Sequence, residues 1–128
     1  VVQNAQVAKE LIQIAGFEDN IDVLLLDPEK ESLVSLLNRR IKKGPQADET
    51  IDFLFIDHDK SLYLSDLRQL EGSGWIKAGC FVAADNVVFA RIDDYRQHMN
   101  SLASKGQVRT RLEESWLEYC QPDFAVYE

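Results

Sequence analysis

The chain has 128 residues, of which 45% are hydrophobic and 28% are charged, a composition typical of one globular domain with its own core. The formal net charge of −8 argues against nucleic acid and anionic membranes as partners, since no basic patch or basic arm is visible. All apolar runs are shorter than the roughly 20 residues of a membrane span. Cys80 and Cys120 match no metal-ligand spacing and indicate a reducing, cytoplasmic compartment, with one disulfide as the alternative.

The first part of the chain predicts two helices on either side of one strand. Apolar residues at 7–15 recur with helical spacing, and Gly16 follows where a glycine would end that helix. The run "IDVLLLD" at 21–27 predicts a strand that is covered on both faces. Apolar residues at 33–41 predict a second helix, and the basic cluster at 39–44 complements the carbonyl end of its macrodipole.

Strand and helix continue to alternate further along the chain. "IDFLFID" at 51–57 predicts a second buried strand, the leucines at 62–70 predict a helix, and "CFVAAD" at 80–85 predicts a third strand. Asp93 or Asp94 can cap a further helix. This alternation with apolar strands indicates an α/β fold with a mostly parallel sheet.

The last part of the chain has a different pattern. Apolar and polar residues alternate at 108–112, and the chain closes with "FAVYE" at 124–128. These two segments predict a C-terminal antiparallel pair of strands.

Polar side chains follow two successive strands of the predicted sheet. Asp57 ends one apolar strand, and Asp85 with Asn86 ends the next. In open α/β sheets, ligands bind at the carboxyl ends of the strands. Two carboxylates and an amide provide hard oxygen ligands of the kind that suit Mg²⁺. The structural alternative is that Asp57 and Asp85 only cap the helices that follow.

One chemistry that fits these residues is phosphoryl transfer. "FLFIDHDKS" at 53–61 approximates the Asp-x-Asp-x-Ser/Thr motif of haloacid-dehalogenase-type enzymes, with Asp57 as nucleophile and Asp59 as acid/base. That motif usually opens its domain, whereas here a strand and two helices precede it. No obvious flap follows the motif, which weakens this alternative.

The other chemistry is methyl transfer. The segment 51–87, with "IDHDK" and "ADNV", resembles the cation-dependent O-methyltransferases, and within them the catechol O-methyltransferase branch. The resemblance extends to 8–27 and to "ESWLEY" at 114–119, and so covers nearly the whole chain. It implies a Rossmann-like methyltransferase sheet, S-adenosylmethionine as methyl donor, Mg²⁺, and a small catechol or related phenol as acceptor.

The resemblance also implies a metal site and a base. The family's metal ligands fall on Asp57, Asp85 and Asn86, and the lysine that takes the proton from the substrate hydroxyl falls on Lys60. A divalent cation lowers the pKa of a hydroxyl that it binds. A lysine beside such a cation is expected to have a lowered pKa, which would suit a general base. Without the resemblance, Lys60 reads as a solvated surface lysine.

Further roles carried over from the family concern the acceptor and the cofactor. Glu118 is expected to hold the second hydroxyl of a catechol, next to Lys60 and Asn86. His58, together with Asp57, is expected beside S-adenosylmethionine. The structural alternatives are an exposed carboxylate for Glu118 and a hydrogen-bonded strand-end histidine for His58.

Several family features are missing from the sequence. None of its six glycines forms a Gly-x-Gly cluster after an apolar strand, and "GSG" at 72–74 follows a helix. Asp59 stands where catechol enzymes often have a tryptophan. An aspartate at this position is similar to the relatives that act on acyl-coenzyme A esters. We therefore expect residues 1–128 to be the C-terminal portion of one methyltransferase domain, which alone binds S-adenosylmethionine poorly and is inactive.

The family's strand order, 3-2-1-4-5-7-6, has a consequence for this chain. It separates the strand at 21–27 from the strand at 51–57 by two strands that the sequence lacks, and so leaves sheet edges unpaired. Such edges suit pairing between two copies in a homodimer. The rival hypothesis is therefore a non-catalytic methyltransferase remnant that acts as an interaction or oligomerisation module.

Overall fold

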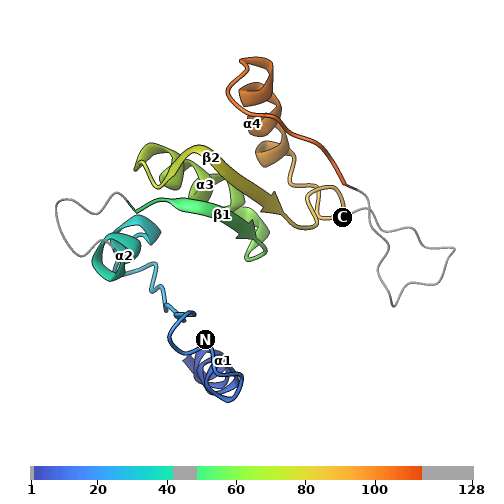
Figure 1. The fold of residues 1–128 in the computed structure, drawn as a ribbon. Coiled ribbons are helices and arrows are strands. Elements are labelled where there is room, and N and C mark those ends of the chain that lie inside the picture. The colour runs from blue at the N-terminus through green and yellow to red at the C-terminus, as the bar shows by residue number, and fades with distance from the viewer. Residues whose placement is uncertain (1, 42–48, 114–128) are drawn as a thin grey trace, which may run out of the picture. The chain divides into compact units, whose positions relative to one another are not determined.

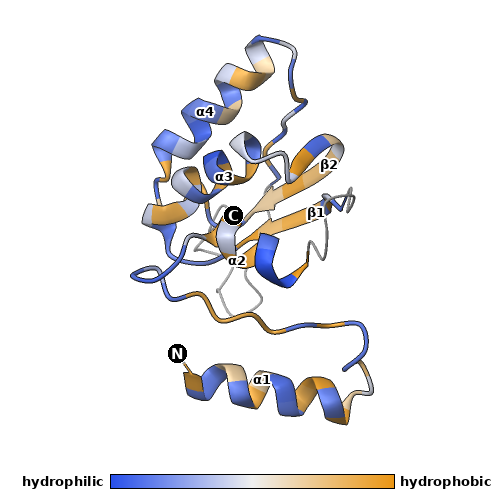
Figure 2. Cartoon of the chain, turned by 90° about the vertical axis from the view of Figure 1, so that its left-hand side faces the viewer, coloured by the Kyte–Doolittle hydropathy of each residue, from blue (hydrophilic) through white to orange (hydrophobic). Residues whose placement is uncertain are grey.

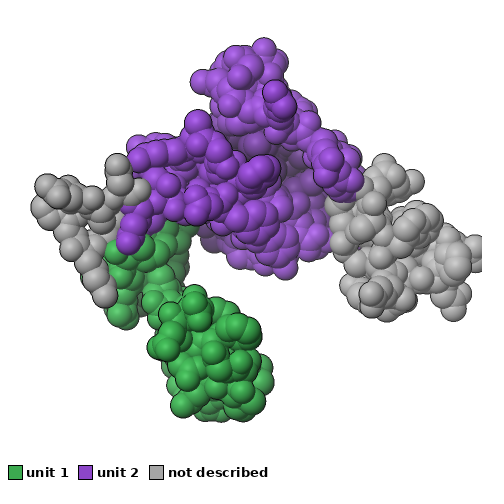
Figure 3. Space-filling model, viewed as in Figure 1, with its two compact units in different colours: residues 1–45 green, residues 46–128 purple. Residues whose placement is uncertain are grey.

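The computed structural model describes residues 2–41 and 49–113. The chain divides into two compact units, residues 1–45 (unit 1) and residues 46–128 (unit 2), as coloured in Figure 3. Each unit is described by itself.

Helix α1 (Val2–Ile14) opens unit 1 and ends at a glycine, as predicted (Figure 1). Gly16 has φ +73°, a left-handed conformation that glycine adopts without steric cost. The N–H of Gly16 donates to the carbonyl of Gln13, and the N–H of Phe17 donates to the carbonyl of Ile12, both at 3.0 Å. These two bonds form a Schellman motif, which satisfies the last carbonyls of the helix.

Helix α2 (Leu33–Arg40) confirms the second predicted helix. The side chain of Ser32 caps its first turn by accepting a hydrogen bond from the N–H of Ser35 at 3.2 Å. In the last turn, Arg39 forms an ion pair with Glu31, with 2.6 Å between the nitrogen and oxygen. A polar cap at one end and cations at the other therefore define this short helix.

The strand predicted at 21–27 is wrong, because the structure shows no regular secondary structure there. Its apolar side chains are partly exposed, with Leu25 at 47%. A β-strand takes its hydrogen bonds from a neighbouring strand. The two strands in the described part of the chain pair only with each other, so nothing pairs with this segment.

Unit 2 contains, in order, β1 (Ile51–Ile56), the 3₁₀ turn η1 (Lys60–Leu62), α3 (Tyr63–Gly72), β2 (Ile76–Ala84) and α4 (Asp93–Ser104). The strands β1 and β2 are parallel, and Figure 1 shows α3 in the connection between them. The register pairs Phe53 with Phe81 and Ile56 with Ala84. The parallel β–α–β arrangement predicted from the sequence is thus confirmed in a sheet of two strands.

The predicted C-terminal antiparallel pair is not part of this sheet. Residues 108–112 have no regular structure, and residues 124–128 lie outside the described residues. The sheet that the structure describes is parallel throughout. Alternating polarity alone does not make a strand, because the backbone also needs a partner.

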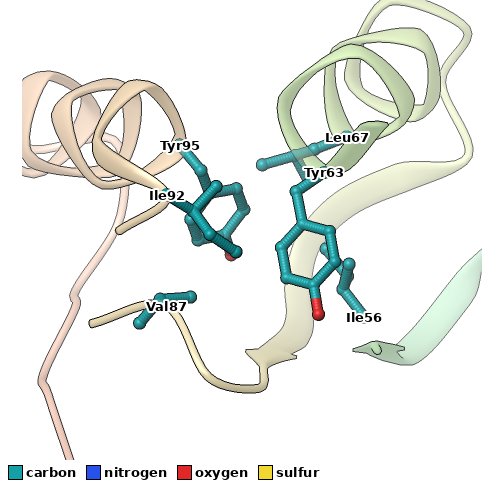
Figure 4. Packing of buried hydrophobic residues seen from close by; sticks show 6 residues of the cluster. All are labelled: Ile56, Tyr63, Leu67, Val87, Ile92 and Tyr95. Carbon is teal, nitrogen blue, oxygen red and sulfur yellow. The ribbon is translucent and has the colours of Figure 1, made fainter. Parts of the chain in front are cut away.

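The core of unit 2 lies on one face of the sheet. It consists of Ile56, Tyr63, Leu67, Val87, Ile92 and Tyr95 (Figure 4). Side chains of alternate strand residues, such as Leu54 and Val82, pack against this cluster. Figure 2 shows that the strands are largely hydrophobic and α4 is largely hydrophilic, in keeping with a helix that has one buried side.

The other face of the sheet is exposed. Phe53, Phe55 and Phe81 are 63%, 58% and 74% exposed, and they alternate along the strands with the core residues. The apolar runs in the sequence predicted burial on both faces, but the core cluster covers only one.

The start of α4 differs from the prediction. The N-cap is Ile92, and Asp93 and Asp94 lie inside the first turn. The carboxylate of Asp94 accepts a hydrogen bond from the N–H of Tyr95 at 2.8 Å. Ile92 is buried in the core, which fixes the helix start one residue before the acidic pair. The two aspartates then stabilise the helix through its macrodipole instead of capping it.

Tyr95 makes the stability of unit 2 depend on pH in the alkaline range. Burial, followed by the charges of Glu71 and Tyr63, raises the pKa of Tyr95 from 10.0 to about 12. The folded pKa of Tyr95 is above the unfolded one. The stability that its buried neutral hydroxyl group contributes is therefore full below pH 10 and is lost as pH rises through about 12. Tyr95→Phe should remove a loss on the order of 1–2 kcal/mol over that interval. Urea unfolding of both proteins along an alkaline pH series measures it, and equal alkaline slopes would contradict the assignment.

Candidate active site

Two aspartates emerge side by side where β1 and β2 end. Asp57 directly follows Ile56, the last residue of β1, and Asp85 directly follows Ala84, the last residue of β2. The N–H of Asp85 donates to the carbonyl of Ile56 at 3.0 Å, which continues the parallel pairing past the last strand residue. The structure thus places both residues at the carboxyl edge of the sheet, where ligands of α/β sheets bind.

Lys60 connects the ends of the two strands. Its Nζ donates to Oδ1 of Asp57 at 2.8 Å and to the hydroxyl of Tyr63 at 2.7 Å. The Tyr63 hydroxyl in turn donates to the carbonyl oxygen of Asp85 at 3.2 Å. A continuous chain of hydrogen bonds therefore runs from the carboxylate after β1 to the backbone after β2.

The partners of Lys60 favour its charged form. Its hydrogen bond to Asp57, followed by that to Tyr63, raises its pKa above the usual value. The sequence-based expectation of a lowered pKa applies to a lysine beside a bound cation. The raised pKa thus reflects Asp57 and Tyr63 as neighbours of the Lys60 amine, and the expected lowered pKa reflects a cation as its neighbour.

His58 and Asp59 both contact residues that are near them in the sequence. Nε2 of His58 lies 3.0 Å from Oδ2 of Asp66 in α3, and its ring centroid lies 5.2 Å from that of Tyr63. Oδ1 of Asp59 accepts hydrogen bonds from the N–H of Ser61 at 3.0 Å and from its hydroxyl at 2.7 Å. These bonds cap η1 and lower the pKa of Asp59. Both residues thus have a structural role in the loop after β1.

Asn86 has an unusual backbone conformation. Its φ is +58°, which asparagine adopts more readily than most residues. Its Nδ2 donates to Oδ1 of Asp85 at 3.0 Å, so the amide nitrogen is turned toward that carboxylate. The carbonyl oxygen of the amide is therefore the atom through which Asn86 can bind a cation.

The chemistry of the predicted ligand set fits Mg²⁺. Asp57, Asp85 and Asn86 offer only oxygen atoms, and Mg²⁺ prefers oxygen ligands and keeps part of its shell for water or substrate. Within residues 2–41 and 49–113, no three side chains of the types His, Cys, Asp and Glu form a group that could hold a metal. The predicted set contains only two such side chains, because its third member is an asparagine.

Sequence reasoning did not identify Tyr63 as part of this site. It is the residue that joins Lys60 to Asp85, and its side chain is buried. The signal that could have found it is spacing, because residues three apart on a helical turn share a face. Glu118, predicted to hold the acceptor, lies outside the described residues, as does Cys120.

Comparison with known proteins identifies the family. Residues 2–112 match the family described as "O-methyltransferase". The chain belongs to the O-methyltransferase family. This confirms the resemblance found from the sequence motifs and supports methyl transfer over the phosphoryl-transfer alternative.

Similar O-methyltransferases come from distant organisms. Catechol O-methyltransferase of Sus scrofa is 30% identical over 118 residues, which are 92% of this chain and 58% of that protein. A probable O-methyltransferase of Mycobacterium tuberculosis is 33% identical over 98 residues, 75% of this chain and 40% of that protein. A transmembrane O-methyltransferase of Homo sapiens is 30% identical over 122 residues, 95% of this chain and 38% of that protein. The chain thus spans between about two-fifths and three-fifths of these O-methyltransferases.

The name of the human relative raises the question of a membrane segment. Of the helices in the described part of this O-methyltransferase chain, none is both long and apolar enough to cross a membrane.

Proposed function

We propose that the protein containing this chain transfers a methyl group from S-adenosylmethionine to a hydroxyl of a catechol-like phenol, with Mg²⁺ and with Lys60 as the base. One observation carries the proposal. The amine of Lys60 lies 2.8 Å from Asp57 and is linked through Tyr63 to Asp85, at the carboxyl edge of a parallel sheet. Family membership and the catechol O-methyltransferase among the relatives support the reaction and the acceptor class.

The proposed chemistry needs a base beside an activated hydroxyl. When bound, S-adenosylmethionine supplies the methyl group as an electrophile and Mg²⁺ lowers the pKa of the acceptor hydroxyl. Asp57, Asp85 and Asn86 would hold the cation through their oxygens. Nζ of Lys60 would receive the proton from the acceptor hydroxyl as the O–CH₃ bond forms and the S–CH₃ bond breaks.

Lys60 must be neutral before it can accept a proton. In the structure Asp57 is the main reason that its pKa is raised. A carboxylate that binds a cation offers less negative charge to a neighbouring ammonium, so engaging Asp57 would remove much of this stabilisation. The contact between Asp57 and Lys60 therefore couples cation binding at the proposed metal site to the formation of neutral Lys60.

The remaining predicted roles belong to the same proposal. Glu118, with Lys60 and Asn86, would orient the acceptor, and His58, with Asp57, would contact S-adenosylmethionine. The contact between His58 and Asp66 would set the orientation of the imidazole. We further propose that residues 1–128 are the C-terminal portion of one methyltransferase domain, so calorimetry on this chain should show weak cofactor binding.

The metal site can be tested on this chain directly. Asp85→Asn should weaken Mn²⁺ binding, used as a paramagnetic substitute for Mg²⁺, by about tenfold or more, because a charged ligand is lost. Electron paramagnetic resonance titration of free Mn²⁺ measures the affinity. Asp93→Asn is the matched control, since it removes the same charge from an exposed position of α4. Equal affinities of all three proteins would show that no Mn²⁺ site lies at the strand ends.

The second candidate function is that of a non-catalytic interaction module. The exposed Phe53, Phe55 and Phe81 on one face of the sheet favour it. Pairing of two copies through open sheet edges would give a homodimer. Light scattering together with an activity assay on the full-length protein separates the two candidates. A stable dimer without turnover supports the interaction module, whereas turnover that stops with EDTA supports the enzyme.

A further inference from the structure

Tyr63 combines a fully buried side chain with a hydroxyl that serves the candidate site. It is the first residue of α3, and its exposed fraction is 0%. The hydroxyl accepts a hydrogen bond from Nζ of Lys60 at 2.7 Å and donates one to the carbonyl of Asp85 at 3.2 Å. Both partners belong to the loops that follow the strands. The polar end of a core residue thus reaches the edge where the chemistry is proposed.

The ring of Tyr63 is held from several sides. Figure 4 shows it among the other core side chains, with the hydroxyl pointing away from Leu67. The ring of Tyr95 meets it edge-on, with centroids 6.0 Å apart and an interplanar angle of 79°. The ring of His58 lies 5.2 Å away on a tilted plane. A packed aromatic ring has only two side-chain torsions, so its hydroxyl is a fixed point.

Lys60 lacks such a fixed position of its own. Its amine sits on a flexible four-carbon stem, and its other partner, Asp57, has a side chain that is 48% exposed. Two hydrogen bonds confine an ammonium group much more than one does. If Asp57 is engaged elsewhere, the Tyr63 hydroxyl is the contact that still holds the amine.

We propose that Tyr63 is a positioning residue: its buried hydroxyl holds the amine of Lys60 at the strand ends and ties it to the backbone of Asp85. This inference rests on the proposed function, in which Lys60 is the base. Tyr63 acts through Lys60 and does not itself touch the acceptor. Because core packing fixes the ring of Tyr63, its hydroxyl fixes the position of the Lys60 nitrogen at the carboxyl edge of the sheet.

The contact can be measured on this chain without any activity. An amine attacks an acylating reagent only as the free base with its lone pair exposed, so a hydrogen-bonded ammonium must first lose a proton and leave its partners. In Tyr63→Phe, which keeps the ring, Lys60 should be acylated by acetic anhydride about tenfold faster, measured by mass spectrometry of its peptide. Exposed Lys9 and Lys105 serve as internal references. Unchanged acylation of Lys60 in a folded Tyr63→Phe protein would overturn the proposal.

Two further variants make the result specific. Tyr95→Phe removes a hydroxyl from the same core cluster and should leave the acylation of Lys60 unchanged. Asp57→Ala removes the other partner at an exposed position, so it keeps the test decisive if Tyr63→Phe does not fold. Lys60 should then stay protected relative to Lys9, because Tyr63 still holds it. Acylation at the rate of Lys9 would contradict a positioning role.

Kinetics of the full-length protein separate this inference from the proposed function. Tyr63→Phe should lower kcat for a catechol about tenfold with little change in KM, because the acceptor still binds while the base is misplaced. A protein that turns over catechols but shows equal kcat with and without the hydroxyl overturns the positioning role alone. Turnover that survives loss of Lys60 overturns the proposed base, and with it this inference, even if the acylation result stands.

Discussion

Lys60→Met is expected to lower kcat of the full-length protein on a catechol by about 10²–10⁴-fold, the usual contribution of a positioned general base. Methionine keeps most of the aliphatic stem but has no nitrogen to receive the proton. The binding of Mn²⁺ should persist, because the proposed ligands Asp57, Asp85 and Asn86 remain. Steady-state kinetics with a catechol and S-adenosylmethionine, together with Mn²⁺ titration, measure both quantities.

Two matched lysine variants sharpen this prediction. Lys60→Arg keeps the positive charge beside Asp57 but should be almost as inactive, because a guanidinium does not release its proton in the accessible pH range. Lys105→Met removes an exposed lysine after α4 and should keep the full rate. If Lys60→Arg retains the rate, the role of Lys60 is electrostatic and the assignment as base fails.

The location of the candidate site could be predicted from the sequence. The apolar run before Asp57 and the run before Asp85 each end abruptly in polar residues, and the alternation with helices indicates parallel strands. Parallel strands present their carboxyl ends at the same edge, so the two aspartates had to be neighbours. The structure places them there, with the N–H of Asp85 bonded to Ile56.

The contacts of the site could not be predicted in the same way. Tyr63 stands in "LYL", where an aromatic residue between leucines indicates only a buried helical face. Whether its hydroxyl reaches Lys60 depends on the turn η1 between β1 and α3, which no periodicity specifies. For the same reason the sequence could not show that Asp59 caps this turn through Ser61.

The predicted strands at 21–27 and 108–112 failed for a different reason. Both segments have the composition or alternation of strands, but a strand is stabilised by pairing with another segment. In the described part of the chain β1 and β2 find each other because α3 connects them at short range. No such local connection provides a partner for the other two. Local pattern therefore predicted the β–α–β unit and failed where pairing is non-local.

The largest expected effect on stability comes from the core beneath the candidate site. Leu67→Ala should lower the free energy of unfolding of unit 2 by about 2–5 kcal/mol, because it leaves a cavity among tightly packed side chains. Leu67 is 2% exposed and packs in the cluster that also holds Tyr63. Alanine is a strong helix former, so the loss would reflect packing and not the propensity of α3. Urea unfolding followed by circular dichroism measures it.

Phe81→Thr is the matched substitution on the opposite face of the sheet. Phe81 is 74% exposed, and threonine keeps good strand propensity, so the cost should stay below about 1 kcal/mol. The comparison also tests whether a second copy of the chain covers this exposed face. If Phe81→Thr costs as much as Leu67→Ala at high protein concentration and little on dilution, a second copy covers the exposed face. A small cost at every concentration would mean that no second copy covers Phe53, Phe55 and Phe81. These side chains would then stay exposed to water, although their burial would be favourable.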